Sequence, residues 1–196
     1  MANICNTELK VYGRHEHVQD LWNTLTHMEA NSKNVWLSDI AEHYGIDCQT
    51  KHISCRGKVY YAELETEEVN GNEVLTICTE TAWTRSELFE VINKDVFKDE
   101  CEVAYREMEC GCDIYCVHDP QGLFFPEECC VTAYGEPFEE ACEDVYATIE
   151  DAIKEWTSKT GIEQEGRTQE QMVEFINEYE YENGESYFYI HPFVFE

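Results

Sequence analysis

The chain has 196 residues, of which 42 are Asp or Glu and 13 are Lys or Arg, so its formal net charge is −29. This charge repels nucleic acid and excludes direct DNA or RNA binding as an expected activity, whereas it suits a basic protein partner or a metal ion. Hydrophobic residues make up 43% of the chain, which is enough for a packed core and argues against disorder.

The sequence also indicates where the protein works. Its first residues show no basic segment followed by an apolar core, and no apolar run approaches the roughly 18 residues of a membrane span. We therefore expect a cytoplasmic protein without a membrane contact, whose 11 cysteines are mostly reduced. Many of these cysteines fall in strand patterns, where Cys acts as a small buried hydrophobe.

The first third of the chain predicts one strand and two helices. Alternation over residues 6–12 predicts a strand. Apolar residues at helical spacing then predict a helix around 18–28 and a short second helix around 37–44. Ser38 is the expected cap of the short helix, and Gly45 follows its end.

Residues 58–118 are the stretch on which the rest of the chain is expected to pack. Asn70-Gly71 predicts a hairpin turn between two strands, because both residues tolerate positive φ. Residues 84–87, Thr-Arg-Ser-Glu, match a capping box before a helix over 88–96. Two more strands follow, and strand-helix-strand-strand-helix-strand is the pattern of a ferredoxin-like α+β fold, with helices on one face of an antiparallel sheet.

Three short motifs carry a resemblance to a known family. They are the opening Met-Ala-Asn-Ile-Cys-Asn-Thr-Glu-Leu, residues 75–83, which end in Thr-Ala-Trp, and residues 105–111, which begin with Tyr-Arg-Glu and end in Gly. They resemble the YubB-type ferredoxin-like proteins of phages and plasmids, whose matching segments are Met-Pro-Asn-Trp-Cys-x-Asn-x-Leu, a strand that ends in Thr-x-Trp, and a Tyr-x-Glu-x-Gly strand end.

The resemblance covers roughly residues 1–118 and has visible departures. Ala2 and Ile4 replace the usual Pro and Trp, and Thr84-Arg85 stands where Ser-Pro-Pro is common. The resemblance implies a ferredoxin-like fold and an origin in a mobile element. It carries over no activity and no site residue.

The last third of the chain predicts a strand and a long helix. Residues 129–134 suit the strand. The helix is expected over 137–160, with Pro137 in its first turn and Gly161 just after its end.

Two further signals complete the expected architecture. Thr168 with Gln171 forms a capping box before another helix, and Asn183-Gly184 predicts a final hairpin into an aromatic strand. We therefore expect a ferredoxin-like core over 1–135, with a C-terminal extension of helices and a β-hairpin over 136–196.

A cluster of cysteines is the sharpest metal candidate. Cys110 and Cys112 share a turn, and Cys116 and His118 follow, so thiolates and an imidazole could hold tetrahedral zinc. The spacing differs from common zinc knuckles, and the last two residues share one strand face, so core thiols are the competing interpretation. No cofactor is expected other than this zinc. Further ligands could come from an earlier segment: Cys48, His52 and Cys55.

Catalytic motifs are weak, and we expect no enzymatic activity. A nucleophilic cysteine needs a lowered pKa beside a base, whereas acidic surroundings raise it. His15-Glu-His17 lacks the spacing of zinc-binding histidines on a helix. The sequence contains neither a phosphate-binding glycine loop nor a nucleophile elbow.

The carboxylates of the predicted long helix are the second candidate site. They form like-charge i,i+4 pairs, each of which costs a few tenths of a kcal/mol. Four residues of helix rise about 6 Å, close to two phosphate steps along one DNA strand. The alternative is a solvated face on an acidic protein. The candidate partner-binding residues are Glu139, Glu140, Glu143, Asp144, Asp151 and Glu155, and four more extend the negative field: Glu178, Glu180, Glu182 and Glu185.

The sequence therefore favours an acidic binding protein that engages a basic protein partner. Its concrete form would be a nucleic-acid mimic that inhibits a DNA- or RNA-directed host defence, such as a restriction or CRISPR effector. A zinc-stabilised structural or regulatory protein is the alternative from another class, and a thiol enzyme is the third.

Overall fold

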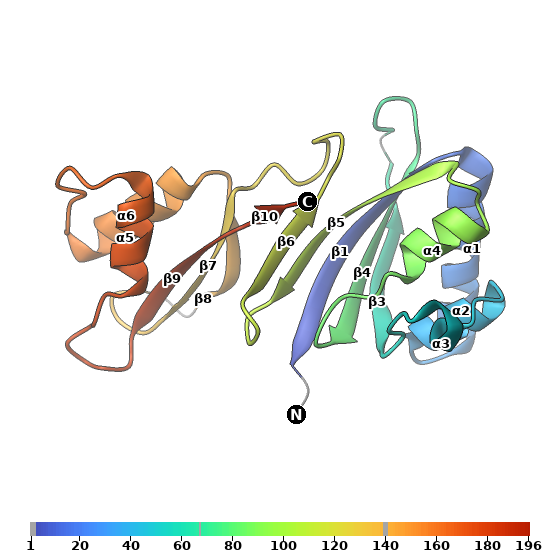
Figure 1. Ribbon diagram of the computed structural model, residues 1–196, viewed down its shortest axis with the longest axis horizontal. Coiled ribbons are helices and arrows are strands. Elements are labelled where there is room, and N and C mark those ends of the chain that lie inside the picture. Colours follow the sequence, from blue (N-terminus) through green and yellow to red (C-terminus); the bar gives the residue numbers. More distant parts are fainter. Residues whose placement is uncertain (1–2, 67, 139–140) are drawn as a thin grey trace. The chain divides into compact units, whose positions relative to one another are not determined.

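The computed structural model describes residues 3–66, 68–138 and 141–196, the last range without the side chains of 141–143 (Figure 1). The chain divides into two compact units, Met1–Phe125 with Phe195–Glu196 (unit 1) and Pro126–Val194 (unit 2). Each unit combines helices with an antiparallel sheet, so the predicted α+β class is confirmed.

A seven-stranded sheet forms the frame of unit 1, in the order β10-β6-β5-β1-β4-β3-β2. The long strand β1 lies near its middle, and Leu9 faces Ile77 on one neighbour and Tyr105 on the other. The strands are β1 (Ile4–Gly13), β2 (Val35–Trp36), β3 (Gly57–Leu64), β4 (Val74–Ala82), β5 (Cys101–Glu109), β6 (Ile114–His118) and β10 (Val194–Phe195). The strands predicted here from alternation are confirmed.

Helices of unit 1 pack on one face of this sheet (Figure 1). They are α1 (His15–Asn31), α2 (Leu37–His43), α3 (Cys48–Lys51) and α4 (Leu88–Asp95). Leu21 of α1 and Ile92 of α4 are buried in the same hydrophobic core as Leu9, and the apolar spacing of both helices predicted their buried faces. Within the described ranges, no helix combines the length and the apolar character needed to cross a membrane.

The predicted hairpin turn at Asn70-Gly71 is confirmed. Both residues have positive φ, 53° and 77°, and Val69 and Asn72 exchange backbone hydrogen bonds of 2.9 and 3.0 Å around them. This is the geometry that a two-residue hairpin loop requires.

Two predicted helix caps are wrong. Helix α4 begins after Glu87 without a side-chain cap, and α2 begins after Trp36 while Ser38 bonds to its neighbour Asp39. The Thr84 hydroxyl donates instead to Oε1 of the buried Glu107, at 3.1 Å. The same carboxylate accepts the Arg85 N–H at 3.0 Å, so a group on a distant strand, and not a local capping box, bonds to the polar groups of this segment.

Unit 2 has a three-stranded sheet in the order β8-β7-β9, with α5 and α6 packed on one face. Its elements are β7 (Cys129–Tyr134), β8 (Ala141–Tyr146), α5 (Ile149–Thr160), α6 (Gln169–Asn177) and β9 (Tyr187–Pro192). Trp156 is fully buried between the helices and the sheet, in contact with the aromatic rings of Phe175 and Tyr179.

The prediction of one long helix over 137–160 is wrong. Residues 141–146 form strand β8, which pairs with β7, and α5 begins only at Ile149. Thr148 is the true N-cap, because its hydroxyl accepts a hydrogen bond from the Asp151 N–H at 3.1 Å. The predicted end is confirmed, since Gly161 closes α5 with a φ of 73°.

The predicted start of α6 is confirmed, whereas the final hairpin is wrong. Thr168 and Gln171 make both bonds of the capping box, at 3.0 and 3.3 Å. A turn does form here, closed by a hydrogen bond of 2.9 Å from the Gly184 N–H to the Tyr181 carbonyl, but the strand that follows it, β9, pairs with β7 and not with the segment before the turn. Turn chemistry alone does not choose a strand's partner.

Candidate protein-interaction surface

Negative charge is concentrated in unit 2. Pro126–Val194 contains 18 Asp or Glu and 3 Lys or Arg, a formal charge of −15 over 69 residues. Unit 1 contains 24 Asp or Glu and 10 Lys or Arg, a formal charge of −14 over 127 residues. Unit 2 is therefore about twice as acidic per residue and is the part of the chain best suited to a basic partner.

The three basic residues of unit 2 already have partners inside it. Lys154 lies 3.0 Å from Glu150 on the same helix, and Lys159 lies 3.8 Å from Glu155. The Arg167 guanidinium lies 4.1 Å from a ring centroid on α6. Most carboxylates of unit 2 consequently have no basic residue of the same unit available to balance them.

Three carboxylates follow one face of α6, and we call them the α6 carboxylate row: Glu170, Glu174 and Glu178. They are exposed, and they lie at i, i+4 and i+8, so they rise about 6 Å at each step. The opposite face buries Met172 and Ile176, and the helix contains no Lys or Arg. The buried pair fixes which face of α6 the carboxylates present to solvent.

Local hydrogen bonds favour the ionised form at the start of this row. The pKa of Glu170 lies below its ordinary value. The larger cause is a hydrogen bond from its own backbone N–H to the carboxylate, and the smaller is a hydrogen bond from the Thr168 hydroxyl. The hydroxyl donates at 2.9 Å. Negative charge in the first helical turn also suits the helix dipole.

Of the six carboxylates predicted along one long helix, the four that lie in the described residues are divided between β8 and α5. Glu139 and Glu140 lie outside the described residues. Glu143 and Asp144 are on β8, and the side chain of Glu143 is not described. The single acidic face of a long helix is therefore wrong, because the chain is a strand where the first half of that helix was expected.

The last two of the six keep the predicted spacing on α5. Asp151 and Glu155 are one turn apart, but Lys154 lies 3.4 Å from Asp151 and Lys159 lies close to Glu155. Glu155 and Lys159 also line a pocket of about 190 Å³ together with Asp144. Asp144, Asp151 and Glu155 therefore each have a lysine nearby. They are less suited to a basic partner than the α6 carboxylate row.

The signal for the α6 carboxylate row was present in the sequence. The helix after Thr168 was predicted, and Glu170 and Glu174 stand four residues apart within it. Glu178 was included only as part of a general negative field.

The predicted zinc residues are spread along one hairpin. Cys110 and Cys112 are in the turn between β5 and β6, while Cys116 and His118 lie farther along β6. His118 stacks on Tyr105 at 5.2 Å. In the part of the chain that the structure describes, no group of three His, Cys, Asp or Glu is placed to hold a metal ion.

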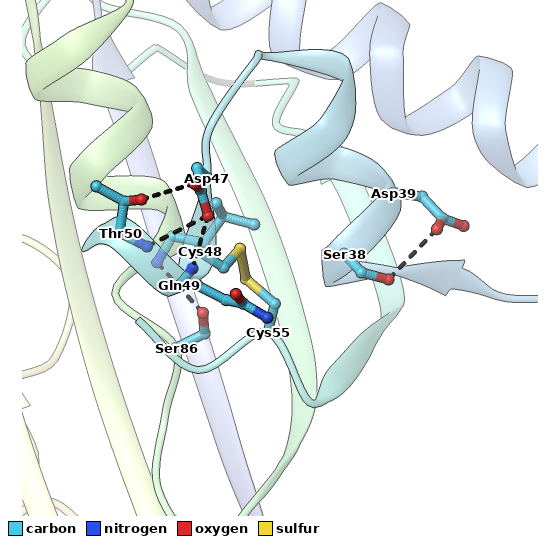
Figure 2. Close-up of a disulfide and its surroundings, with 9 residues drawn as sticks. Ser38, Asp39, Asp47, Cys48, Gln49, Thr50, Cys55 and Ser86 are labelled. Carbon is cyan, nitrogen blue, oxygen red and sulfur yellow. Dashed lines mark hydrogen bonds between the residues drawn. A yellow bond between two sulfur atoms is a disulfide. The ribbon is translucent and has the colours of Figure 1, made fainter. Parts of the chain in front are cut away.

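The earlier cysteines proposed as further ligands form a disulfide. Figure 2 shows Cys48 and Cys55 joined through their sulfur atoms across a loop that contains α3, with Cα atoms 6.7 Å apart. Asp47 caps α3 by accepting the Gln49 and Thr50 N–H groups at 3.0 and 3.2 Å. Disulfide sulfurs are not thiolates, so this pair cannot bind zinc while the bond is closed.

Breaking this disulfide is expected to lower the stability of unit 1. A bridge between residues seven apart in sequence lowers the conformational entropy of the unfolded chain. This contributes about 2 kcal/mol to the free energy of unfolding. Dithiothreitol should therefore lower the thermal midpoint by about 5 °C, measured by circular dichroism. The variant C48S/C55S should begin at the lower midpoint and show no response to dithiothreitol. An equal response in that variant would show that the effect arises elsewhere.

Four other thiols are poorly suited to nucleophilic chemistry. Burial is the main cause that raises the pKa of Cys5 to about 12, of Cys101 to about 11 and of Cys129 to about 12. Burial also raises the pKa of Cys116. These shifts are opposite to what a reactive cysteine requires at neutral pH.

Comparison of the chain with protein-family models, with curated proteins and with solved structures gave no match.

Proposed function

We propose that this chain is a non-enzymatic binding protein whose acidic unit 2 occupies a basic surface of another protein in place of a nucleic-acid backbone. The α6 carboxylate row is the observation that carries the proposal. Each of its steps rises about 6 Å. Two phosphate steps along one strand of DNA advance about 6.8 Å. A groove that accepts phosphates at that interval can accept these carboxylates.

The electrostatics of α6 also favours a basic protein partner. Like charges at i,i+4 on a helix are unfavourable by a few tenths of a kcal/mol, and Glu170, Glu174 and Glu178 form two such pairs. A basic partner would remove that repulsion and would associate faster because of the long-range field of unit 2. Such binding weakens as salt screens the charges.

The topology of unit 1 supports the family resemblance of residues 1–118. In chain order these elements are β1, α1, β3, β4, α4 and β5, and the four strands have the order β5-β1-β4-β3 in the sheet. We propose that this is a ferredoxin-like arrangement in which β2, β6 and β10 are additions. With the resemblance to phage and plasmid proteins, it favours a cytoplasmic inhibitor of a restriction or CRISPR effector.

The test is charge reversal with a matched control. The variant E170K/E174K/E178K should lose at least about tenfold in affinity for a basic effector, because three favourable contacts become repulsive. The variant E29K/E42K/E68K changes exposed carboxylates of unit 1 by the same total charge and should retain affinity within about twofold.

The measurement is displacement of a fluorescent DNA duplex from purified restriction and CRISPR effectors, followed by anisotropy at about 50 and about 200 mM salt. Displacement by the parent chain and the control, but not by the α6 variant, is the expected result. Equal losses in both variants would mean that only net charge matters. A parent chain that displaces the duplex from none of the effectors contradicts the mimic.

A further inference from the structure

Three exposed tyrosines form a row on the sheet face of unit 2 that is opposite to its helices. On β9, Phe188 and Ile190 are buried with α5 and α6, and because side chains alternate along a strand, Tyr187 and Tyr189 lie on the other face. Tyr134 of β7 is paired with Tyr187. We call Tyr134, Tyr187 and Tyr189 the tyrosine row; they are 45%, 37% and 40% exposed.

The rings of the tyrosine row stack on one another. Ring centroids of Tyr134 and Tyr187 are 6.0 Å apart and those of Tyr187 and Tyr189 are 5.2 Å apart, with interplanar angles of 24° and 18°. His191 continues the row at 6.2 Å and shares a hydrogen bond of 2.9 Å with Thr132. Tyr134 is therefore at the opposite end of the stack from this histidine.

The edge of the sheet beside the row is already occupied at one point. Asn177 donates to the Ile190 carbonyl at 2.9 Å and accepts from the Ile190 N–H at 2.8 Å, as a neighbouring strand would. This side chain blocks strand addition at the centre of β9. A partner of the row is consequently expected to contact its rings rather than extend the sheet.

Carboxylates flank the end of the row that holds Tyr134. Glu136 follows Tyr134 by two residues and Glu185 precedes Tyr187 by two, and both are exposed. The Ser186 hydroxyl donates to the Glu136 carbonyl at 2.7 Å, so the two segments meet there. Stacked rings beside carboxylates, in a unit of charge −15, select a cation.

The chain already uses this combination for one of its own arginines. The Arg85 guanidinium lies 3.8 Å from the Tyr105 ring centroid and also pairs with the carboxylates of Glu90 and Glu107. A planar guanidinium can stack on a ring and bond to a carboxylate at the same time, whereas a lysine ammonium can only approach as a point charge.

We propose that the tyrosine row binds arginine side chains of a basic protein partner, with the guanidinium stacked on Tyr134 and paired with Glu136 or Glu185. This inference rests on the proposed function and names the residue chemistry that unit 2 recognises. The α6 carboxylate row supplies general attraction to a basic surface, and the tyrosine row supplies a preference for arginine over lysine.

The test uses the full chain and two labelled peptides of equal charge, nona-arginine and nona-lysine, with dissociation constants measured by fluorescence anisotropy. The parent chain should bind nona-arginine at least about threefold more tightly than nona-lysine. The variant Y134L should remove this preference by weakening only the arginine peptide, and Y134F should retain it because the ring remains. Tyr61 is also 45% exposed and belongs to unit 1, so Y61L is the matched control without effect.

Each other outcome has a distinct meaning. Equal affinities for the two peptides, unchanged in Y134L, would overturn the arginine preference and leave the acidic-binding proposal intact. Binding of neither peptide at low salt would overturn both proposals. Saturable binding of cellohexaose, lost in Y134L but not in Y61L, together with no arginine preference, would assign the row to carbohydrate instead.

Discussion

Replacing Glu107 by alanine is expected to lower the free energy of unfolding by about 3 kcal/mol, because it removes a buried charge that several groups share. The Glu107 side chain is only 7% exposed, and its Oε1 accepts from the Thr84 hydroxyl at 3.1 Å and from the Arg85 N–H at 3.0 Å. The Cys5 thiol donates to the same oxygen at 3.3 Å. This one carboxylate connects β5 to β1 and to the turn before α4.

The measurement is urea unfolding of E107A, followed by circular dichroism. E107Q keeps an acceptor oxygen in the same place and should lose less. E80A is the matched control, because Glu80 makes a half-exposed ion pair of 3.1 Å with Lys58 and should change stability by less than about 1 kcal/mol. If E107A proves no more destabilised than E80A, the carboxylate does not organise the turn.

The same carboxylate explains why local sequence signals failed before α4. Thr84 and Glu87 have the spacing of a capping box, and residue types with that spacing usually bond to each other. Glu107 lies 23 residues beyond Thr84, and the pairing of β5 with β1 brings it beneath the turn. A signal that involves four consecutive residues cannot include this acceptor. The Thr168 hydroxyl, in contrast, has only a local carboxylate, that of Glu170, to donate to, and it still accepts from the Gln171 N–H as predicted.

The wrong prediction of one helix over 137–160 has a different cause. Phe138, Val145 and Ile149 fit helical spacing, so the pattern from Pro137 to Gly161 could be read as one amphipathic helix. Instead, Val145 pairs with Cys130 in the sheet, and the Thr148 cap begins α5 only at Ile149. Apolar periodicity places the buried faces of α5 and α6 correctly, but it does not reveal that an extended segment gains a full set of backbone bonds from a neighbouring strand.

These two cases also explain how much of the candidate surface could be predicted. Composition identifies an acidic protein with a basic partner as the expected class, and α6 could be located from its cap. The tyrosine row could be predicted only as an aromatic strand, because its exposure depends on which face of β9 the helices cover. That choice requires the pairing of β9 with β7, which links residues 53 or more apart.

Replacing Trp156 by alanine is expected to cost about 4 kcal/mol and to unfold unit 2 selectively. Trp156 is fully buried, and its indole N–H donates to the Tyr181 hydroxyl at 2.7 Å. Its ring also makes edge contacts with Phe175 and Tyr179, at 5.9 and 5.4 Å between centroids. Among the residues that the structure describes, Trp156 is the largest fully buried side chain, so a cavity there would remove the centre of the small core of unit 2.

Hydrogen exchange read by mass spectrometry can separate the two units. In W156A, amide protection should fall throughout Pro126–Val194 and persist in β1, β4 and β5, because each unit has its own hydrophobic core. W156F keeps most of the ring contacts and should lose less, and W36A, at a side chain that is 45% exposed, should leave both units protected. A uniform loss of protection across the whole chain in W156A would show that the units unfold as one, and the acidic surface of unit 2 would then depend on the integrity of unit 1.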